Sequence, residues 1–112
     1  MTILTIGRNT YELRLNTRAS ISLEKALGFN PINMFMAIEN GQMPRLGDML
    51  VMLHAMLQPM NHGMSMDKVY DLYDDYVADG HNLFDLVPVF IEVFQDAGYM
   101  AKTDGKEGAE KN

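Results

Sequence analysis

The stretch from Pro44 to Pro59, PRLGDMLVMLHAMLQP, limits what this chain can fold into more than any other part of it. At about 100° per residue, a helix between the two prolines places four leucines in one narrow stripe and three methionines in a second stripe beside it. These residues are Leu46, Leu50, Leu53 and Leu57, and Met49, Met52 and Met56. Together they form an apolar arc of about 160°, and few polar residues interrupt the rest of the helix. A helix of this kind is typical of the centre of a fold, so we predict a buried organising helix.

The residues before this helix predict a β-hairpin and two further helices. Thr2 to Ile6 and Tyr11 to Leu15 have the composition of two strands, with turn residues between them. We expect the inward side chains to be Leu4 and Ile6 in the first strand and Tyr11, Leu13 and Leu15 in the second. Asn16 or Thr17 can cap a helix that ends at Gly28. Pro31 suits the first turn of a short helix that Gly41 closes.

The residues after the central helix predict two more helices and a tail. Ser65 can cap the segment MDKVYDLYDDYVADG, which has an apolar side and, on the other side, a row of acids: Asp67, Asp71, Asp74, Asp75 and Asp79. Asn82 can cap the last helix, in which Pro88 predicts a kink or a late start. We therefore predict an α+β, mainly α, domain over residues 1–100, with an N-terminal β-hairpin and about five helices around the Met/Leu-rich helix. The polar residues 101–112 predict a disordered tail.

Charge and composition narrow the class of protein. The net charge of −6 disfavours nucleic acid and anionic lipid as partners, because both are bound by concentrated Lys and Arg. The absence of cysteine excludes disulfides and thiolate chemistry. No export signal and no apolar run of membrane-spanning length is visible in the sequence. We therefore expect a soluble protein that is not exported.

Residues capable of catalysis or metal binding are few and scattered. His54, His62 and His81 stand far apart in the sequence, so they would form a metal or catalytic site only if the fold gathered them. The acidic row lies along a helix and does not wrap around an ion as a calcium loop does. No phosphate-binding glycine loop or nucleophile turn is present. The sequence therefore predicts no catalytic residue, no cofactor and no metal site, and we do not expect an enzyme.

The order of elements resembles that of the tail assembly chaperones of long-tailed (siphovirus-type) bacteriophages and prophages. The similarity covers about residues 2 to 100 and is carried by the opening MTILTIGRNTYELRLNTRASISLEKALGFNP, the segment SMDKVYDLYDDYVADG, and the closing LVPVFIEVFQDAGYM. The resemblance implies a helical, non-enzymatic protein of the bacterial host cytoplasm that is absent from the mature virion. It also implies two partners: the tape measure protein, which it binds and keeps soluble, and the tail tube protein, whose subunits it helps recruit.

A surplus of apolar helix surface supports binding to another polypeptide. A small domain has too little interior to bury all of its apolar helix surface. Large exposed apolar patches mark partner sites. We predict that the methionine side of the central helix, with nearby residues, accepts an apolar helix of the tape measure protein. The predicted partner-binding residues are Met34, Phe35, Met36, Met49, Met52, Met56 and Met60. Homo-oligomerisation through the same surplus is a further expectation.

Other classes of protein share parts of this pattern. A structural tail component or another phage-encoded protein-binding adaptor would have the same acidic, helical composition. A helix-turn-helix DNA-binding protein would need a basic recognition helix, but the two best candidate helices are acidic. A small hydrolase or metal enzyme would need the three histidines to converge.

Overall fold

The computed structural model describes residues 1–102 of the chain. In chain order, the elements are β1 (Thr2–Ile6), β2 (Asn9–Leu13), α1 (Thr17–Leu27), α2 (Pro31–Glu39), α3 (Leu46–Leu57), α4 (Met66–Ala78), the short 3-10 helix η1 (Leu83–Asp85) and α5 (Leu86–Asp96). The described residues form an α+β, mainly α-helical fold with an N-terminal hairpin and five α-helices, which confirms the predicted fold class. Of the predicted tail 101–112, residues 103–112 lie outside the described part of the chain.

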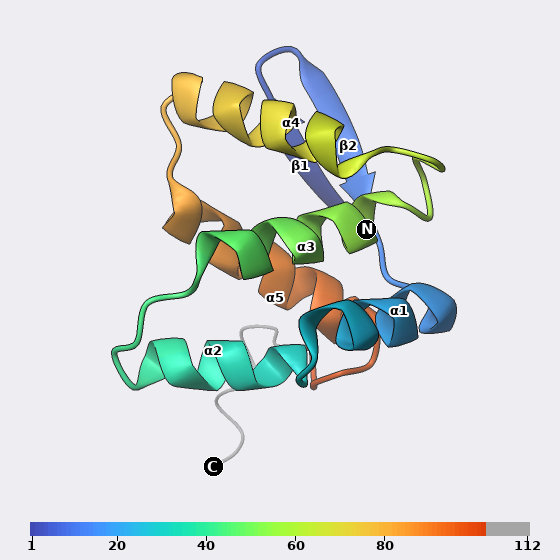
Figure 1. Ribbon diagram of the computed structural model, residues 1–112, viewed down its shortest axis with the longest axis vertical. Helices are drawn as coiled ribbons and strands as arrows, with labels where there is room; N and C mark the ends of the chain where they lie inside the picture. The colour runs from blue at the N-terminus through green and yellow to red at the C-terminus, as the bar shows by residue number, and fades with distance from the viewer. Residues whose placement is uncertain (103–112) are drawn as a thin grey trace.

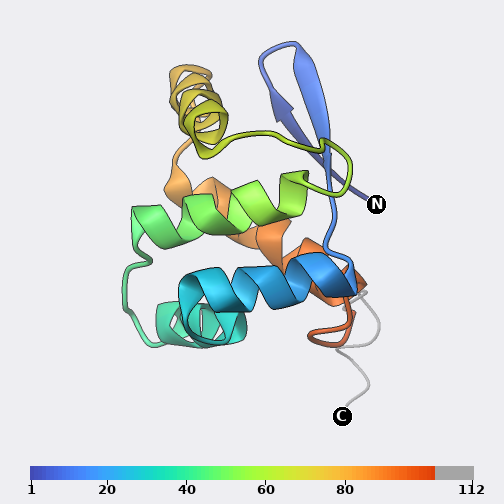
Figure 2. The same cartoon turned by 45° about the vertical axis from the view of Figure 1, so that its right-hand side comes forward.

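The helix α3 lies at the centre of the fold, between α1 and α4 (Figures 1 and 2). It packs against α1, α4 and β2, while β1 contacts both α4 and α5. The prediction of a central helix between Pro44 and Pro59 is therefore confirmed. The elements that pack on α3 come from both sides of it in the sequence: β2 and α1 precede it, and α4 follows it.

The hairpin covers the core with one face only. Its strands pair antiparallel, with Leu4 opposite Tyr11 and Thr2 opposite Leu13. Leu4, Ile6 and Leu13 are buried as expected, while Ile3 and Thr5 on the other face are exposed. The second strand begins and ends two residues earlier than the predicted Tyr11 to Leu15, and Tyr11 is only half-buried. The backbone N–H of Arg14 donates to the Met56 carbonyl on α3 over 2.9 Å. A two-stranded sheet alone is only marginally stable. This hydrogen bond and the buried face of the hairpin hold the sheet against the helices.

Local capping chemistry explains where the helices begin. The Asn16 side chain accepts from the Ala19 N–H over 2.8 Å at the start of α1, and the Ser65 hydroxyl accepts from the Lys68 N–H at the start of α4. Pro88 sits in the first turn of α5, where its missing N–H costs no helical hydrogen bond. Of the two alternatives predicted for Pro88, a kink or a late helix start, the structure shows the late start: α5 begins after the short η1 turn.

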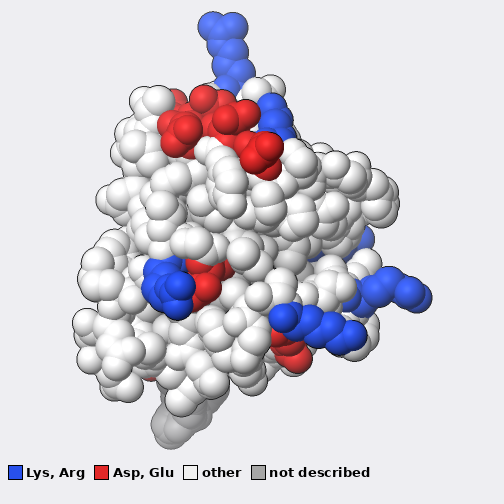
Figure 3. Space-filling model, in the orientation of Figure 1, with Lys and Arg blue, Asp and Glu red and all other residues white. Residues whose placement is uncertain are grey.

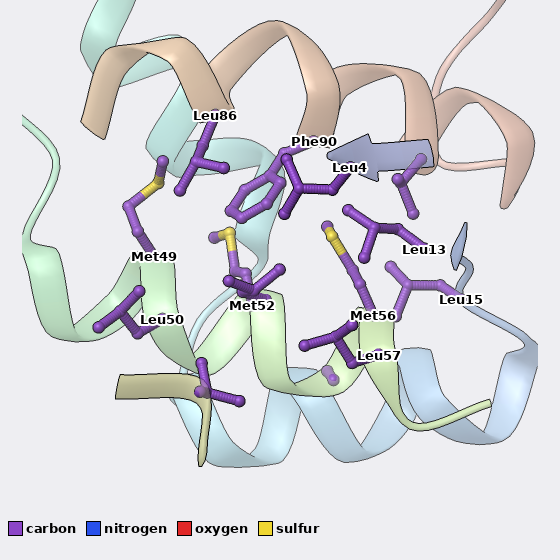
Figure 4. Close-up of a cluster of buried hydrophobic side chains, with 14 of the residues drawn as sticks. Leu4, Leu13, Leu15, Met49, Leu50, Met52, Met56, Leu57, Leu86 and Phe90 are labelled. Carbon is purple, nitrogen blue, oxygen red and sulfur yellow. The ribbon is translucent and has the colours of Figure 1, made fainter. Parts of the chain in front are cut away.

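The three methionines of α3 are core residues, which corrects part of the predicted partner-binding surface. Met49, Met52 and Met56 are each 0% exposed. They point from α3 toward Leu86 and Phe90 of α5 and toward the inner face of the hairpin (Figure 4). The hairpin and α5 both cover this side of α3, so the methionine stripe fills the interior instead of forming a surface.

The leucine stripe of α3 also departs from the prediction at one end. Leu50, Leu53 and Leu57 are buried, but Leu46 is about half exposed. Leu46 is the first residue of α3 and follows the loop from α2. The end of the helix thus extends past the elements that cover its other leucines.

Candidate functional site

The predicted partner-binding residues divide into buried and exposed members. Met34 and Phe35 on α2 are buried, as are the three methionines of α3. Met36 and Met60 remain accessible, with 57% and 46% of their surface exposed. They lie on α2 and just beyond α3 and do not adjoin the buried methionines in one surface. The structure therefore does not gather the predicted set into a single accessible site.

A groove between α1 and α3 is the best-formed hollow on the described surface. Its volume is about 360 Å³. The two helices lie side by side and run in opposite directions (Figure 2). Its apolar lining consists of Ala19, Leu23 and Ala26 from α1 and Val51, Ala55 and Pro59 from α3 and its end. Three of these six side chains are alanines. Because alanine is small, the groove has room for larger apolar side chains.

The polar residues around this groove are neutral or basic. They are Asn16, Arg18, Ser22, His54, Gln58 and His62. The full chain has 15 acidic residues against nine basic ones, but none of the residues lining the groove is acidic. None of the ion pairs within residues 1–102 includes Arg18. The groove therefore has an apolar floor and a positive edge on a protein that is negative as a whole.

Side-chain hydrogen bonds fix one wall of the groove. His54 Nε2 donates to the Met64 carbonyl over 2.9 Å, and Gln58 Nε2 donates to the same oxygen over 2.8 Å. Gln58 Oε1 also accepts from the Gly63 N–H. These bonds hold the loop after α3 against the helix, so the wall is already formed without a ligand. Such preorganisation lowers the entropic cost of binding.

The three histidines do not converge. His54 and His62 both line the groove, but His81 stacks on Tyr76, with ring centroids 4.3 Å apart, and contacts Asp85. Burial raises the pKa of the Tyr76 phenol, and the nearby charges of Asp85 and Tyr73 raise this pKa further. Within the described part of the chain, no cluster of His, Asp and Glu side chains is arranged to hold a metal ion.

A smaller hollow of about 190 Å³ lies at the junction of α2 and the following loop. Phe29, Met34 and Met43 contribute apolar surface to it, and Arg45 and Asp48 at its edge form an ion pair 3.9 Å long. The acid beside the arginine makes this site electrically balanced, unlike the α1–α3 groove.

Sequence reasoning missed the groove because two separate helices form it. The available signal was Val51 and Ala55, which stand on the side of α3 away from the leucine and methionine stripes. Apolar residues on that side, beside His54 and Gln58, indicate a second contact surface on the same helix.

The fold and the groove define a small, mainly helical domain with an apolar groove on its surface. The chain belongs to DUF6096, a family of unknown function, whose model matches residues 2–112. No curated protein and no solved structure matches the chain. None of the described helices combines the length and the apolar character needed to cross a bilayer.

Proposed function

We propose that this protein is a non-enzymatic phage tail assembly chaperone, which binds the tape measure protein, keeps it soluble and helps bring tail tube subunits to it. The resemblance in the order of elements over about residues 2 to 100 supports this role. The observation that carries the proposal is the α1–α3 groove, because an apolar groove with a polar edge can receive the apolar side chains of an amphipathic helix. In this proposal, the groove replaces the buried methionine stripe as the contact surface.

The proposed binding mode places the apolar stripe of a tape measure helix against Ala26 and Val51, at the open part of the groove. Leu23 and Ala55 are buried or nearly so, whereas Ala26 is exposed at the open part of the groove. A large side chain at position 26 would therefore fill the hollow with little disturbance of the core.

The test is co-expression of this protein with a tape measure protein from the genome that encodes it. We expect wild-type protein to keep the tape measure protein soluble and to co-purify with it. Ala26→Trp should abolish co-purification while its far-UV circular dichroism stays unchanged. Ala78→Trp, at an exposed alanine at the end of α4, is the matched control and should bind normally. Full binding by Ala26→Trp would reject the groove as the contact surface.

The two exposed methionines of the original prediction are tested in the same assay. Met36→Gln and Met60→Gln alter accessible side chains outside the groove lining. A loss of tape measure binding in Met36→Gln, with Ala26→Trp unaffected, would move the contact to α2. The same result in Met60→Gln would move it to the loop after α3.

A chaperone and a structural tail component differ in where the protein is found after assembly. We propose that the protein acts in the host cytoplasm and leaves before the tail is complete. Quantitative mass spectrometry of purified mature particles should therefore detect no stoichiometric amount of the chain. A fixed copy number per particle would favour the structural role.

A further inference from the structure

An apolar stripe runs along one flank of α4, between its buried face and its acidic side, and the core covers this stripe only in part. Tyr70 and Val77 are 49% and 47% exposed, and Met66 and Tyr73 are partly buried beside them. These four residues follow the spacing i, i+4, i+7 and i+11, so they form one stripe along the helix. We call Met66, Tyr70, Tyr73 and Val77 the α4 stripe.

Acidic side chains border the α4 stripe on one side. Asp67, Asp71 and Asp74 repeat at i, i+4 and i+7, and all three are exposed. None of them takes part in an ion pair within residues 1–102. Acidic side chains gather over α4 in Figure 3, while basic side chains project beside α1.

The edge of the α1–α3 groove has a matching row of positive charge. Arg18 lines the groove, and Lys25 lies seven residues further along the same edge of α1; both are exposed. Glu24 is turned away from this edge, since it accepts a hydrogen bond from the Tyr99 hydroxyl over 2.9 Å. Arg18 and Lys25 are about 10.5 Å apart along the helix axis, as are Asp67 and Asp74 on α4.

Size as well as charge makes the two surfaces complementary. The groove has alanines where the α4 stripe has tyrosines, so large side chains meet small ones. Within one molecule the two surfaces cannot meet, because α3 lies between α1 and α4 and forms a wall of the groove (Figures 1 and 2). The stripe that fits the groove therefore has to come from another molecule.

We infer that the groove binds the α4 stripe of a second copy of this chain, with Arg18 and Lys25 facing Asp67 and Asp74 of that copy. The contact deepens the proposed function, because the same groove would receive the tape measure helix. Self-association shields the groove while the tape measure protein is absent, and that protein displaces the second copy when it is present.

The experiment measures self-association of the purified full-length chain by sedimentation velocity over a concentration series, at low and at high salt. Wild-type protein should associate, and high salt should weaken the association, because exposed charges are screened. Two charge-reversal variants test the two halves of the contact. Arg18→Glu with Lys25→Glu reverses the groove edge, and Asp67→Lys with Asp74→Lys reverses the α4 row.

Each double variant alone should associate at least about tenfold more weakly than wild type, because attraction becomes repulsion at two pairs. An equimolar mixture of the two should associate again, since each reversed surface then finds an opposite charge. Asp75→Lys with Glu39→Lys is the matched control for the α4 variant: it changes the net charge by the same amount and sign, but its exposed residues lie off the stripe and the groove. This control should associate like wild type.

Three results would overturn the inference. They are a wild-type chain that stays monomeric at every concentration, association that survives both reversals, and a groove occupied by a co-purified small molecule in the native mass spectrum. The tape measure assay separates the two proposals. The α4 variant should retain tape measure binding, because its groove is intact, so a failure there points to the proposed function and not to the self-contact.

Discussion

At the scale of single residues, the same amino acid has opposite roles in this protein. Met56 is sealed beneath the hairpin, whereas Met36 on α2 lies more than half exposed. Methionine suits both positions, because its flexible, polarisable side chain fills irregular interiors and adapts to partners. Residue type alone therefore cannot distinguish the two roles.

Truncating one buried methionine should measure its packing directly. Met56→Ala is expected to lower the free energy of unfolding by about 2–5 kcal/mol, because it leaves a cavity next to α5 and the hairpin. Urea denaturation followed by circular dichroism gives this value. Met36→Ala is the control and should change stability by less than about 0.5 kcal/mol. Equal effects at both positions would contradict the assigned burial.

The Tyr99 phenol predicts a loss of stability in alkali. Burial raises its pKa, and the hydrogen bond that it donates to Glu24 raises this pKa further, with a smaller opposing effect from Ser20. Because the folded state holds this proton more tightly than the unfolded state, its contribution is complete below about pH 10 and is lost as pH rises through the folded pKa. Tyr99→Phe should therefore reduce the loss of stability above about pH 10. The measurement is the urea midpoint from pH 8 to 11, and identical slopes for both proteins would contradict the prediction.

At the scale of elements, local chemistry made the helices predictable. Asn16 and Ser65 cap helices where predicted, whereas Asn82 caps η1 and not α5; Gly28 closes α1 in the left-handed conformation, with φ of 82°. These signals act within one helical turn, so they need no knowledge of the rest of the fold.

Removing one cap tests how far such a local interaction stabilises the groove wall. Asn16→Ala should lower stability by about 1 kcal/mol, because the Ala19 N–H loses its partner. Thr17→Ala, the adjacent position, provides a control that keeps the Asn16 cap. Urea midpoints that shift equally for the two variants would show that the cap contributes nothing.

What periodicity could not provide is which elements cover each face. The arc of α3 predicted an apolar helix correctly, but the coverage of Met49, Met52 and Met56 depends on the hairpin and α5, which are distant in the sequence. The groove was missed for the same reason, since Ala26 and Val51 become neighbours only when α1 packs on α3. In the first strand, alternation left both faces possible, and the burial of Leu4 and Ile6 shows which face meets the core.

At the scale of the whole molecule, a few side-chain hydrogen bonds connect elements that are far apart in the sequence. The Gly7 N–H at the hairpin turn donates to Asp79 Oδ2 at the end of α4 over 3.1 Å. Gly7 has φ of 61°, a left-handed conformation that places its N–H in the tight turn at low steric cost. This contact joins residues 72 positions apart.

Breaking that contact should loosen the hairpin more than the rest of the protein. Asp79→Ala is expected to cost about 0.5–1.5 kcal/mol, the usual net value of one hydrogen bond. Hydrogen exchange followed by mass spectrometry should speed up in peptides that cover the turn and change little in α3. Asp75→Ala removes an exposed acid on the same helix and should leave the turn unchanged. Faster exchange throughout the protein would show that the contact is not local.

The positions of the groove and the α4 stripe, on either side of α3, determine how copies could add to one another. Because the two surfaces are different, each added molecule presents a fresh binding surface at its free end, and growth does not stop at a pair. Such a row of molecules stops growing where a helix of another protein binds the last open groove. The concentration of client protein would then govern the length of the assembly.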